Sequence, residues 1–369
     1  MRLIGIDASR AETNEKSGTE NYSYQIIKAI ASTSCQDELR LYKRADGLWF
    51  DKSLQVEEIK IGLSFMWTQL GLAAKTWTDK IDVLFVPAHV VPFMKNPLIP
   101  VVVTVHDLRT EFLPQHSSLL QKFYLNRFTE KVRAMLASHI IAVSESTKND
   151  IISRLGVSSE KITVVYEGVD HLHYDVKKLT DQSKCDDVLS RYNIANDYLL
   201  FVGTIQPRKN LVRLMQAFAQ VASERQGLDL VVAGKKGWMY DDILATPAKL
   251  GLSNRIRFID YVKTEDLPYL YGGAKALVFP SLYEGFGLPI LESFAMGTPV
   301  LTSNISSMPE VGGEFAVYVE PTSVDDISRG IFDVLKINAE PQSFVDYSKN
   351  FSWEKAGRQT LKILQDNMR

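Results

Sequence analysis

The segment from Ala276 to Val311 constrains the fold more than any other, because it predicts a strand, a glycine loop, a helix and a second strand in succession. Residues 276–279 form the short apolar run expected of a buried strand in a parallel sheet. Gly285 and Gly287 let the loop backbone approach a ligand closely, and Pro289 suits the first position of a helix. The helix N-terminus therefore points toward whatever the loop holds, and its unpaired N–H groups favour an anion.

Two glutamates belong to this loop and helix. Glu284 and Glu292 have seven residues between them, which predicts one carboxylate on the loop and one on the first turn of the helix. Both carboxylates can then face the same crevice. The alternative is that Glu292 is a solvated helix residue and that the glycines only make a turn.

Length and composition limit the classes of protein to consider. A chain of 369 residues is long enough for two domains, each with its own core. The 42 basic and 44 acidic residues nearly cancel, which argues against a nucleic-acid binder that relies on bulk positive charge. The two cysteines, Cys35 and Cys185, are too few for a disulfide framework, and MRLIGIDASR predicts a strand rather than a signal peptide. We therefore expect a cytoplasmic protein.

A second loop, 203–210, follows an apolar strand at 198–202 and carries two adjacent cations, Arg208 and Lys209. An apolar-periodic helix begins directly after them. Two cations beside a helix N-terminus can neutralise a diphosphate group. The alternative is a pair of basic residues that holds no ligand.

Strands are predicted in the first half at 3–6, 39–42, 83–86, 101–105 and 140–143. In an open α/β sheet, ligands bind beyond the carboxyl ends of such strands. His106 and Asp107 follow one strand directly and His89 follows another, so each is a candidate site residue, although a lone histidine is more often structural. Gly18 precedes a predicted helix at 22–30 that Thr19 or Asn21 is placed to cap.

Between the halves the composition changes to a polar, lysine-rich stretch, after which the pattern of strand, glycine loop and helix starts again. We therefore predict an α/β protein with an N-terminal Rossmann-like domain at 1–172, a linker at 173–196, a second Rossmann-like domain at 197–350, and a terminal helix at 351–369.

The pattern of two glutamates with seven residues between them, including Gly-Phe-Gly-Leu-Pro, resembles that of the retaining glycosyltransferases of family 4. The resemblance implies the GT-B fold, in which two Rossmann-like domains face each other across a cleft. It also implies that the terminal helix, 351–369, crosses back to the first domain. It implies that Glu284 and the loop amides hold the donor sugar and that Glu292 binds the ribose. It also implies that Arg208 and Lys209 hold the diphosphate.

Further roles follow from the same resemblance. Catalysis is assigned to His106, Glu284, Arg208 and Lys209, with His106 near the reacting carbon of the sugar. Donor binding is assigned to Gly18, Gly203, Arg208, Lys209, Gly234, Lys235, Tyr261, Val262, Glu284, Gly285, Phe286, Gly287, Leu288 and Glu292. Two positions depart from the family: Thr204 stands where many relatives have arginine, and Asp260 where they often have glycine, which leaves the choice of nucleobase open.

The acceptor side carries fewer signals, and we assign Asp107, Trp67 and His89 to it. Residues 65–67 either form an exposed aromatic patch for a sugar or lipid or belong to the core. The predicted amphipathic helix 117–138 has a basic polar face, which is either simply solvated or drawn to an anionic membrane surface.

We therefore expect a retaining glycosyltransferase that moves a hexose from a nucleotide diphosphate sugar to a saccharide or lipid-linked acceptor. No Asp-x-Asp triplet occurs in the sequence, so we expect no metal and no other cofactor. Similarity to bacterial mannosyltransferases of polysaccharide assembly favours GDP-mannose, with UDP-glucose or another UDP-hexose as alternatives. A sugar-nucleotide epimerase and a non-catalytic sugar-nucleotide binding protein remain as rivals.

Overall fold

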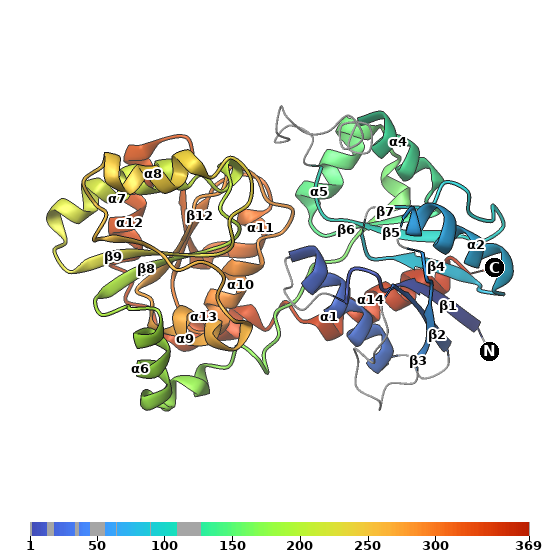
Figure 1. The fold of residues 1–369 in the computed structure, drawn as a ribbon, viewed down its shortest axis with the longest axis horizontal. Helices are drawn as coiled ribbons and strands as arrows, with labels where there is room; N and C mark the ends of the chain where they lie inside the picture. The colour runs from blue at the N-terminus through green and yellow to red at the C-terminus, as the bar shows by residue number, and fades with distance from the viewer. Residues whose placement is uncertain are drawn as a thin grey trace. The chain divides into compact units, whose positions relative to one another are not determined.

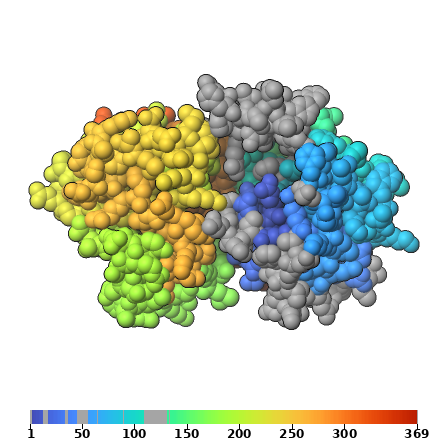
Figure 2. Space-filling model, viewed as in Figure 1, coloured from blue at the N-terminus to red at the C-terminus, as the bar shows by residue number. Residues whose placement is uncertain are grey.

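The computed structural model describes residues 2–12, 18–33, 37–44, 56–63, 65–88, 90–108 and 127–368 (Figure 1). Contacts divide the chain into two compact units. The first comprises Met1–Gly168 together with Ser352–Arg369, and the second comprises Val169–Phe351. Figure 2 shows the second unit in space-filling form, coloured from green to orange along the chain.

Within the described residues the first unit contains a seven-stranded parallel sheet of order β3-β2-β1-β4-β5-β6-β7. The strands are β1 (Arg2–Asp7), β2 (Asp37–Lys43), β3 (Val56–Lys60), β4 (Val83–Val86), β5 (Val101–Val105), β6 (His139–Ala142) and β7 (Ile162–Val164). Strands β4 and β5 are buried along their whole length, which explains why they are uninterrupted apolar runs.

The α-helices of the first unit are α1 (Gly18–Thr33), α2 (Ala73–Thr78), α4 (Arg127–Leu136), α5 (Glu145–Asp150) and α14 (Trp353–Asp366). They are joined by the π-helices η1 (Trp67–Leu72) and η3 (Ile151–Leu155) and the 3-10 helix η4 (Ser159–Lys161). Alternate residues of β5 face opposite sides of the sheet. Thr104 faces α1, where its hydroxyl lies 3.1 Å from that of Tyr22, while Val103 packs with the core that includes Ala134 and Ile151.

Helix α1 begins earlier than predicted, at Gly18, so Thr19 and Asn21 lie inside the helix and the predicted capping role is wrong. The hydroxyl of Ser23 donates to the carbonyl of Thr19 at 2.9 Å, which fits a helical backbone already at that residue. At the other end of the chain, α14 packs on α1 (Figure 1). A side chain on Gly357 would come within 2.6 Å of Ala29, so glycine lets the two helices approach.

The second unit contains a six-stranded parallel sheet of order β10-β9-β8-β11-β12-β13 in the described residues. The strands are β8 (Asp197–Val202), β9 (Leu228–Ala233), β10 (Ile256–Phe258), β11 (Ala276–Phe279), β12 (Val300–Ser303) and β13 (Ala316–Val319). From β8 the chain proceeds outward to β9 and β10, then returns to β11 on the other side of β8. The loops after β8 and β11 therefore meet where the strand order reverses, which is where open α/β sheets bind ligands.

Helices cover both faces of this sheet, with α7, α8 and α12 on one side and α9, α10 and α13 on the other (Figure 1). The α-helices of the second unit are α6 (Gln182–Arg191), α7 (Leu211–Glu224), α8 (Asp241–Lys249), α9 (Leu267–Gly273), α10 (Leu288–Ala295), α11 (Met308–Gly312), α12 (Val324–Val334) and α13 (Pro341–Ser348). Its 3-10 helices are η5 (Val176–Thr180), η6 (Pro207–Lys209), η7 (Thr264–Asp266) and η8 (Gly313–Phe315).

The segment predicted as a linker, 173–196, is instead folded into the second unit, which begins at Val169 rather than after residue 196. Asp181 caps α6 by accepting a hydrogen bond from the backbone N–H of Lys184. Arg191 at the end of α6 then pairs with the buried carboxylate of Asp266 at 2.7 Å. A polar composition therefore reflects an exposed helix face here rather than an unstructured connection.

Candidate functional site in the second unit

The loop between β11 and α10 has the form that the sequence predicts. Gly287, with φ 111°, precedes the first turn of α10, and Gly297, with φ 73°, follows its last turn. Only glycine adopts such angles readily, so both ends of the helix are fixed by the sequence. Glu292 is the fifth residue of α10 and lies in its second turn, so the predicted first-turn placement is wrong.

Two hydroxyls hold the loop that carries Glu284. Ser306 donates to the carbonyl of Glu284 at 2.5 Å and accepts from the N–H of the same residue at 3.2 Å. Ser307 donates to the carbonyls of Glu284 and Phe286, at 3.0 and 2.7 Å. The backbone around Glu284 is therefore fixed from the segment after β12, which sequence reasoning did not identify.

The loop after β8 lies against the loop after β9 because Gly234 has no side chain at the point of contact. A side chain on Gly234 would come within 2.0 Å of the carbonyl oxygen of Gly203. The N–H of Ile205 donates to the carbonyl of Lys235 at 2.9 Å, and the N–H of Gly234 donates to the carbonyl of Asp260 at 2.7 Å. These contacts bring the predicted donor-binding segments after β8, β9 and β10 together.

Asn210 fixes the position of the two cations that precede it. Its backbone has φ 60°, a left-handed conformation that asparagine tolerates better than most residues. Its side-chain amide donates to the carbonyls of Pro280 and Pro321, at 3.0 and 2.6 Å. The carbonyl of Arg208 in turn accepts from the N–H of Leu282 at 2.9 Å. The cation loop is therefore tied to the loop of Glu284.

Arg208, Lys209 and Glu284 form a buried charge cluster, which we call the charge trio. Nη1 of Arg208 lies 2.7 Å from Oε2 of Glu284, and Nζ of Lys209 lies 2.6 Å from Oε1. None of the three residues is more than 8% exposed. Burial alone would raise the pKa of Glu284, but the two cations more than offset it and lower that pKa to about 2. The carboxylate is therefore ionised at any physiological pH.

Two tyrosines contact the carboxylate of Glu292. The hydroxyl of Tyr271, a fully buried residue of α9, donates to Oε2 of Glu292 at 2.6 Å. Tyr174 also hydrogen-bonds this carboxylate, and its ring packs edge-on against that of Tyr271. Burial and the nearby carboxylate both raise the pKa of each tyrosine, so each keeps its proton and donates. Neither tyrosine lies near Glu292 in sequence, so no local pattern indicates the contact.

The remaining predicted donor-binding residues of this unit differ in exposure. Lys235 is exposed and Tyr261 is 37% exposed, so both side chains are available to a ligand. The side chain of Val262 is only 5% exposed, which leaves its backbone as the group able to contact a nucleobase.

His106, in the first unit, is buried rather than facing solvent. Its Nε2 lies 2.9 Å from the carbonyl oxygen of Pro87, so that nitrogen carries a hydrogen. Its Nδ1 lies 3.3 Å from the carboxylate of Glu167, and the edge of its ring packs against Tyr22. Asp107 is also buried. These contacts position His106 firmly, and its assignment to the donor sugar stays a prediction.

One of the predicted acceptor-side residues, Trp67, has a clear outcome. Trp67 is only 1% exposed and its indole N–H donates to the carbonyl of Ile61, so its assignment to the acceptor is wrong and it belongs to the core. Phe65, two residues earlier, is 78% exposed. His89 and residues 117–126 of the predicted helix 117–138 lie outside the described residues. In the described part of that prediction, α4 accounts for 127–136.

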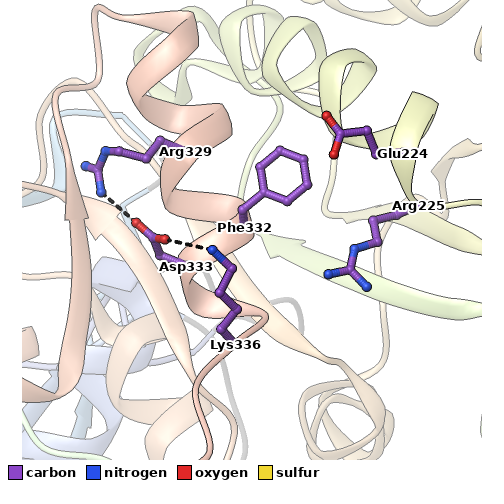
Figure 3. A pocket seen from close by; sticks show the side chains of 6 residues that line it. All are labelled: Glu224, Arg225, Arg329, Phe332, Asp333 and Lys336. Atoms are coloured by element: carbon purple, nitrogen blue, oxygen red, sulfur yellow. Dashed lines mark hydrogen bonds and ion pairs between the residues drawn. The ribbon is translucent and has the colours of Figure 1, made fainter.

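An open hollow of about 590 Å³ lies between the end of α7 and α12, far along α7 from the charge trio. Its lining residues are Glu224, Arg225, Arg329, Phe332, Asp333 and Lys336. In Figure 3, Arg329 and Lys336 both reach toward Asp333, at 2.8 and 3.6 Å. Because the side chains of Arg329, Asp333 and Lys336 are exposed to solvent, the hollow lacks the buried charges of the charge trio.

Known structures share the architecture of both units. The glycosyltransferase from Rickettsia africae superimposes with a TM-score of 0.76 at 17% identity, covering 99% of this chain and 98% of its own. HepE from Anabaena, solved in complex with UDP and glucose, superimposes with a TM-score of 0.72 at 19% identity over 99% of this chain and 100% of its own. The fold is therefore GT-B.

Sequence comparison supplies the family. Residues 55–171 match the family described as Glycosyltransferase Family 4, and residues 192–351 match Glycosyl transferases group 1. O-antigen chain mannosyltransferase B of Escherichia coli is 30% identical over 93% of this chain and 94% of its own. O-antigen chain mannosyltransferase RfbU of Salmonella typhimurium is 29% identical over 72% and 68%. The chain belongs to the family 4 glycosyltransferases and is a glycosyltransferase.

No helix in the described ranges is long and apolar enough to cross a membrane. Among the same residues, no group of three or more His, Cys, Asp and Glu side chains is arranged to hold a metal ion.

The contact between Tyr271 and Glu292 generates a testable prediction. Tyr271→Phe removes one hydrogen bond to a carboxylate and leaves the buried ring in place. The resemblance assigns Glu292 to the ribose, and without this hydrogen bond its carboxylate is less firmly oriented. On that assignment we expect GDP and UDP to bind about fivefold more weakly, roughly 1 kcal/mol, in a calorimetric titration.

Tyr318→Phe is a matched control, since that hydroxyl donates to the carbonyl of Gly313, at 2.5 Å, and touches neither Glu292 nor the charge trio. Equal nucleotide affinity in the wild-type protein and Tyr271→Phe would show that the tyrosine serves packing alone.

Proposed function

We propose that this enzyme is a retaining, metal-independent mannosyltransferase that uses GDP-mannose and extends a saccharide or lipid-linked saccharide in polysaccharide assembly. The observation that carries the proposal is the 30% identity, over nearly the whole chain, to O-antigen chain mannosyltransferase B of Escherichia coli. A second O-antigen mannosyltransferase, RfbU, matches across 72% of the chain. The charge trio supplies the chemistry that such a transfer needs.

In this proposal Arg208 and Lys209 bind the donor diphosphate and stabilise the negative charge that grows on it as the glycosidic bond breaks. Both side chains are buried, and the guanidinium of Arg208 also donates to the backbone carbonyl of Tyr283, so they need little rearrangement when that charge develops. Glu284 orients the sugar and Glu292 binds the ribose. The leaving phosphate oxygen then accepts the proton of the acceptor hydroxyl as the new bond forms on the same face of the sugar.

A panel of nucleotide sugars tests the donor. Slow hydrolysis of each sugar nucleotide, measured without acceptor, should be fastest for GDP-mannose and should release the α-anomer first, because attack occurs on the face that the nucleotide leaves. Faster turnover of UDP-glucose or another UDP-hexose would replace the donor but keep the glycosyltransferase. Conversion of the intact nucleotide sugar to its epimer, without loss of nucleotide, would contradict the proposal.

Metal independence has its own test. Two buried cations supply the charge that a divalent ion would otherwise bring to the diphosphate, so activity should persist in excess EDTA. Loss of activity in EDTA that magnesium or manganese restores would show that the cations do not suffice. A parallel assay with added magnesium and no chelator controls for ionic strength.

A further inference from the structure

The charge trio has a property that the proposed roles alone do not explain, because its members bind one another. Arg208 and Lys209 each take one oxygen of the Glu284 carboxylate, at 2.7 and 2.6 Å. These are the same two side chains that the proposed function assigns to the donor diphosphate. A carboxylate and a phosphate offer similar acceptor oxygens to such donors.

The pairing with Glu284 stabilises Arg208 and Lys209 in their buried positions. Arg208 and Lys209 are 6% and 8% exposed, and an uncompensated buried cation strongly destabilises a fold. Glu284 supplies one negative charge to the pair, and the ring of Phe279 lies 4.8 Å from Nζ of Lys209. The Glu284 carboxylate therefore lets the two cations remain buried and correctly placed.

The same carboxylate opposes the binding of an anion. A diphosphate that reaches Arg208 and Lys209 meets the negative charge of Glu284 a few ångströms away, in surroundings that screen charges poorly. We propose that Glu284 is an internal counter-ion, which the donor diphosphate displaces from Arg208 and Lys209 and which is thereby released to bind the sugar. This inference rests on the proposed function and adds an order of events to it.

The proposal changes the behaviour expected of a free nucleotide. From the sequence alone, Glu284 is expected to hold only the sugar, so its removal should leave the affinity for a nucleoside diphosphate unchanged. If Glu284 is a counter-ion that must be displaced, removing its charge should instead strengthen the binding of that nucleotide. The two expectations differ in sign.

The test is calorimetric titration of GDP, UDP and inorganic pyrophosphate into the wild-type protein and Glu284→Gln. Glutamine keeps the size of the side chain and removes its charge. We expect each anion that binds the wild-type protein to bind Glu284→Gln about tenfold more tightly or better, while the ligand-free variant melts at a lower temperature. The gain should shrink at high salt.

Glu224→Gln is the matched control. It makes the same substitution in the same unit, at the exposed far end of α7, and leaves the charge trio intact. Its affinity for each anion should equal that of the wild-type protein. A gain as large as that of Glu284→Gln would show that net charge alone is responsible and would overturn the proposal.

Glu284→Asp covers the case in which Glu284→Gln does not fold. Aspartate keeps the charge but is shorter by one methylene, so it pairs less well with both cations and should give a smaller gain in anion affinity. Unchanged or weaker binding in the variants, with normal GDP or UDP binding in the wild-type protein, would overturn the counter-ion alone. Failure of the wild-type protein to bind any nucleoside diphosphate would instead overturn the proposed function.

Discussion

A single buried carboxylate, shared between two buried cations, is the interaction on which the arrangement of the second unit depends. Charged side chains stay buried only when they are paired, so Arg208, Lys209 and Glu284 must be brought together with little freedom. Asn210 ties the cation loop to the end of β11, and Ser306 and Ser307 hold the loop of Glu284. The surrounding hydrogen bonds are thus the means by which the fold maintains this pairing.

The topology of the sheet brings these loops to one place. Because β8 and β11 are neighbours although far apart in sequence, the loops that follow them open at the same edge, where the strand order reverses. Gly203 and Gly234 then allow a backbone contact that any side chain at Gly234 would block. The fold common to the GT-B enzymes therefore supplies the position, and the side chains on its loops supply the chemistry.

Much of this was predictable from the sequence, and the remainder has a common physical cause. Strands, the glycine loop and the helix of residues 276–311 follow from local patterns, since a residue such as Gly287 determines its own backbone. Contacts between distant residues do not follow from such patterns. Three such contacts join segments that only the tertiary fold brings together. They are the hydrogen bond from Tyr271 to Glu292, the contact of Glu167 with His106, and the pairing of Glu284 with the two cations. The folded segment 173–196 was missed because polar composition describes a solvated helix as well as a linker.

The proposed function requires Arg208 and Lys209 to bind the terminal phosphate of a nucleoside diphosphate. The ratio of dissociation constants for GMP and GDP isolates that phosphate, since both ligands share the base and the ribose. The wild-type protein should prefer GDP, and Lys209→Met should reduce that preference by roughly tenfold or more, while its affinity for GMP changes little. The same preference for GDP in Lys209→Met as in the wild-type protein would contradict this account.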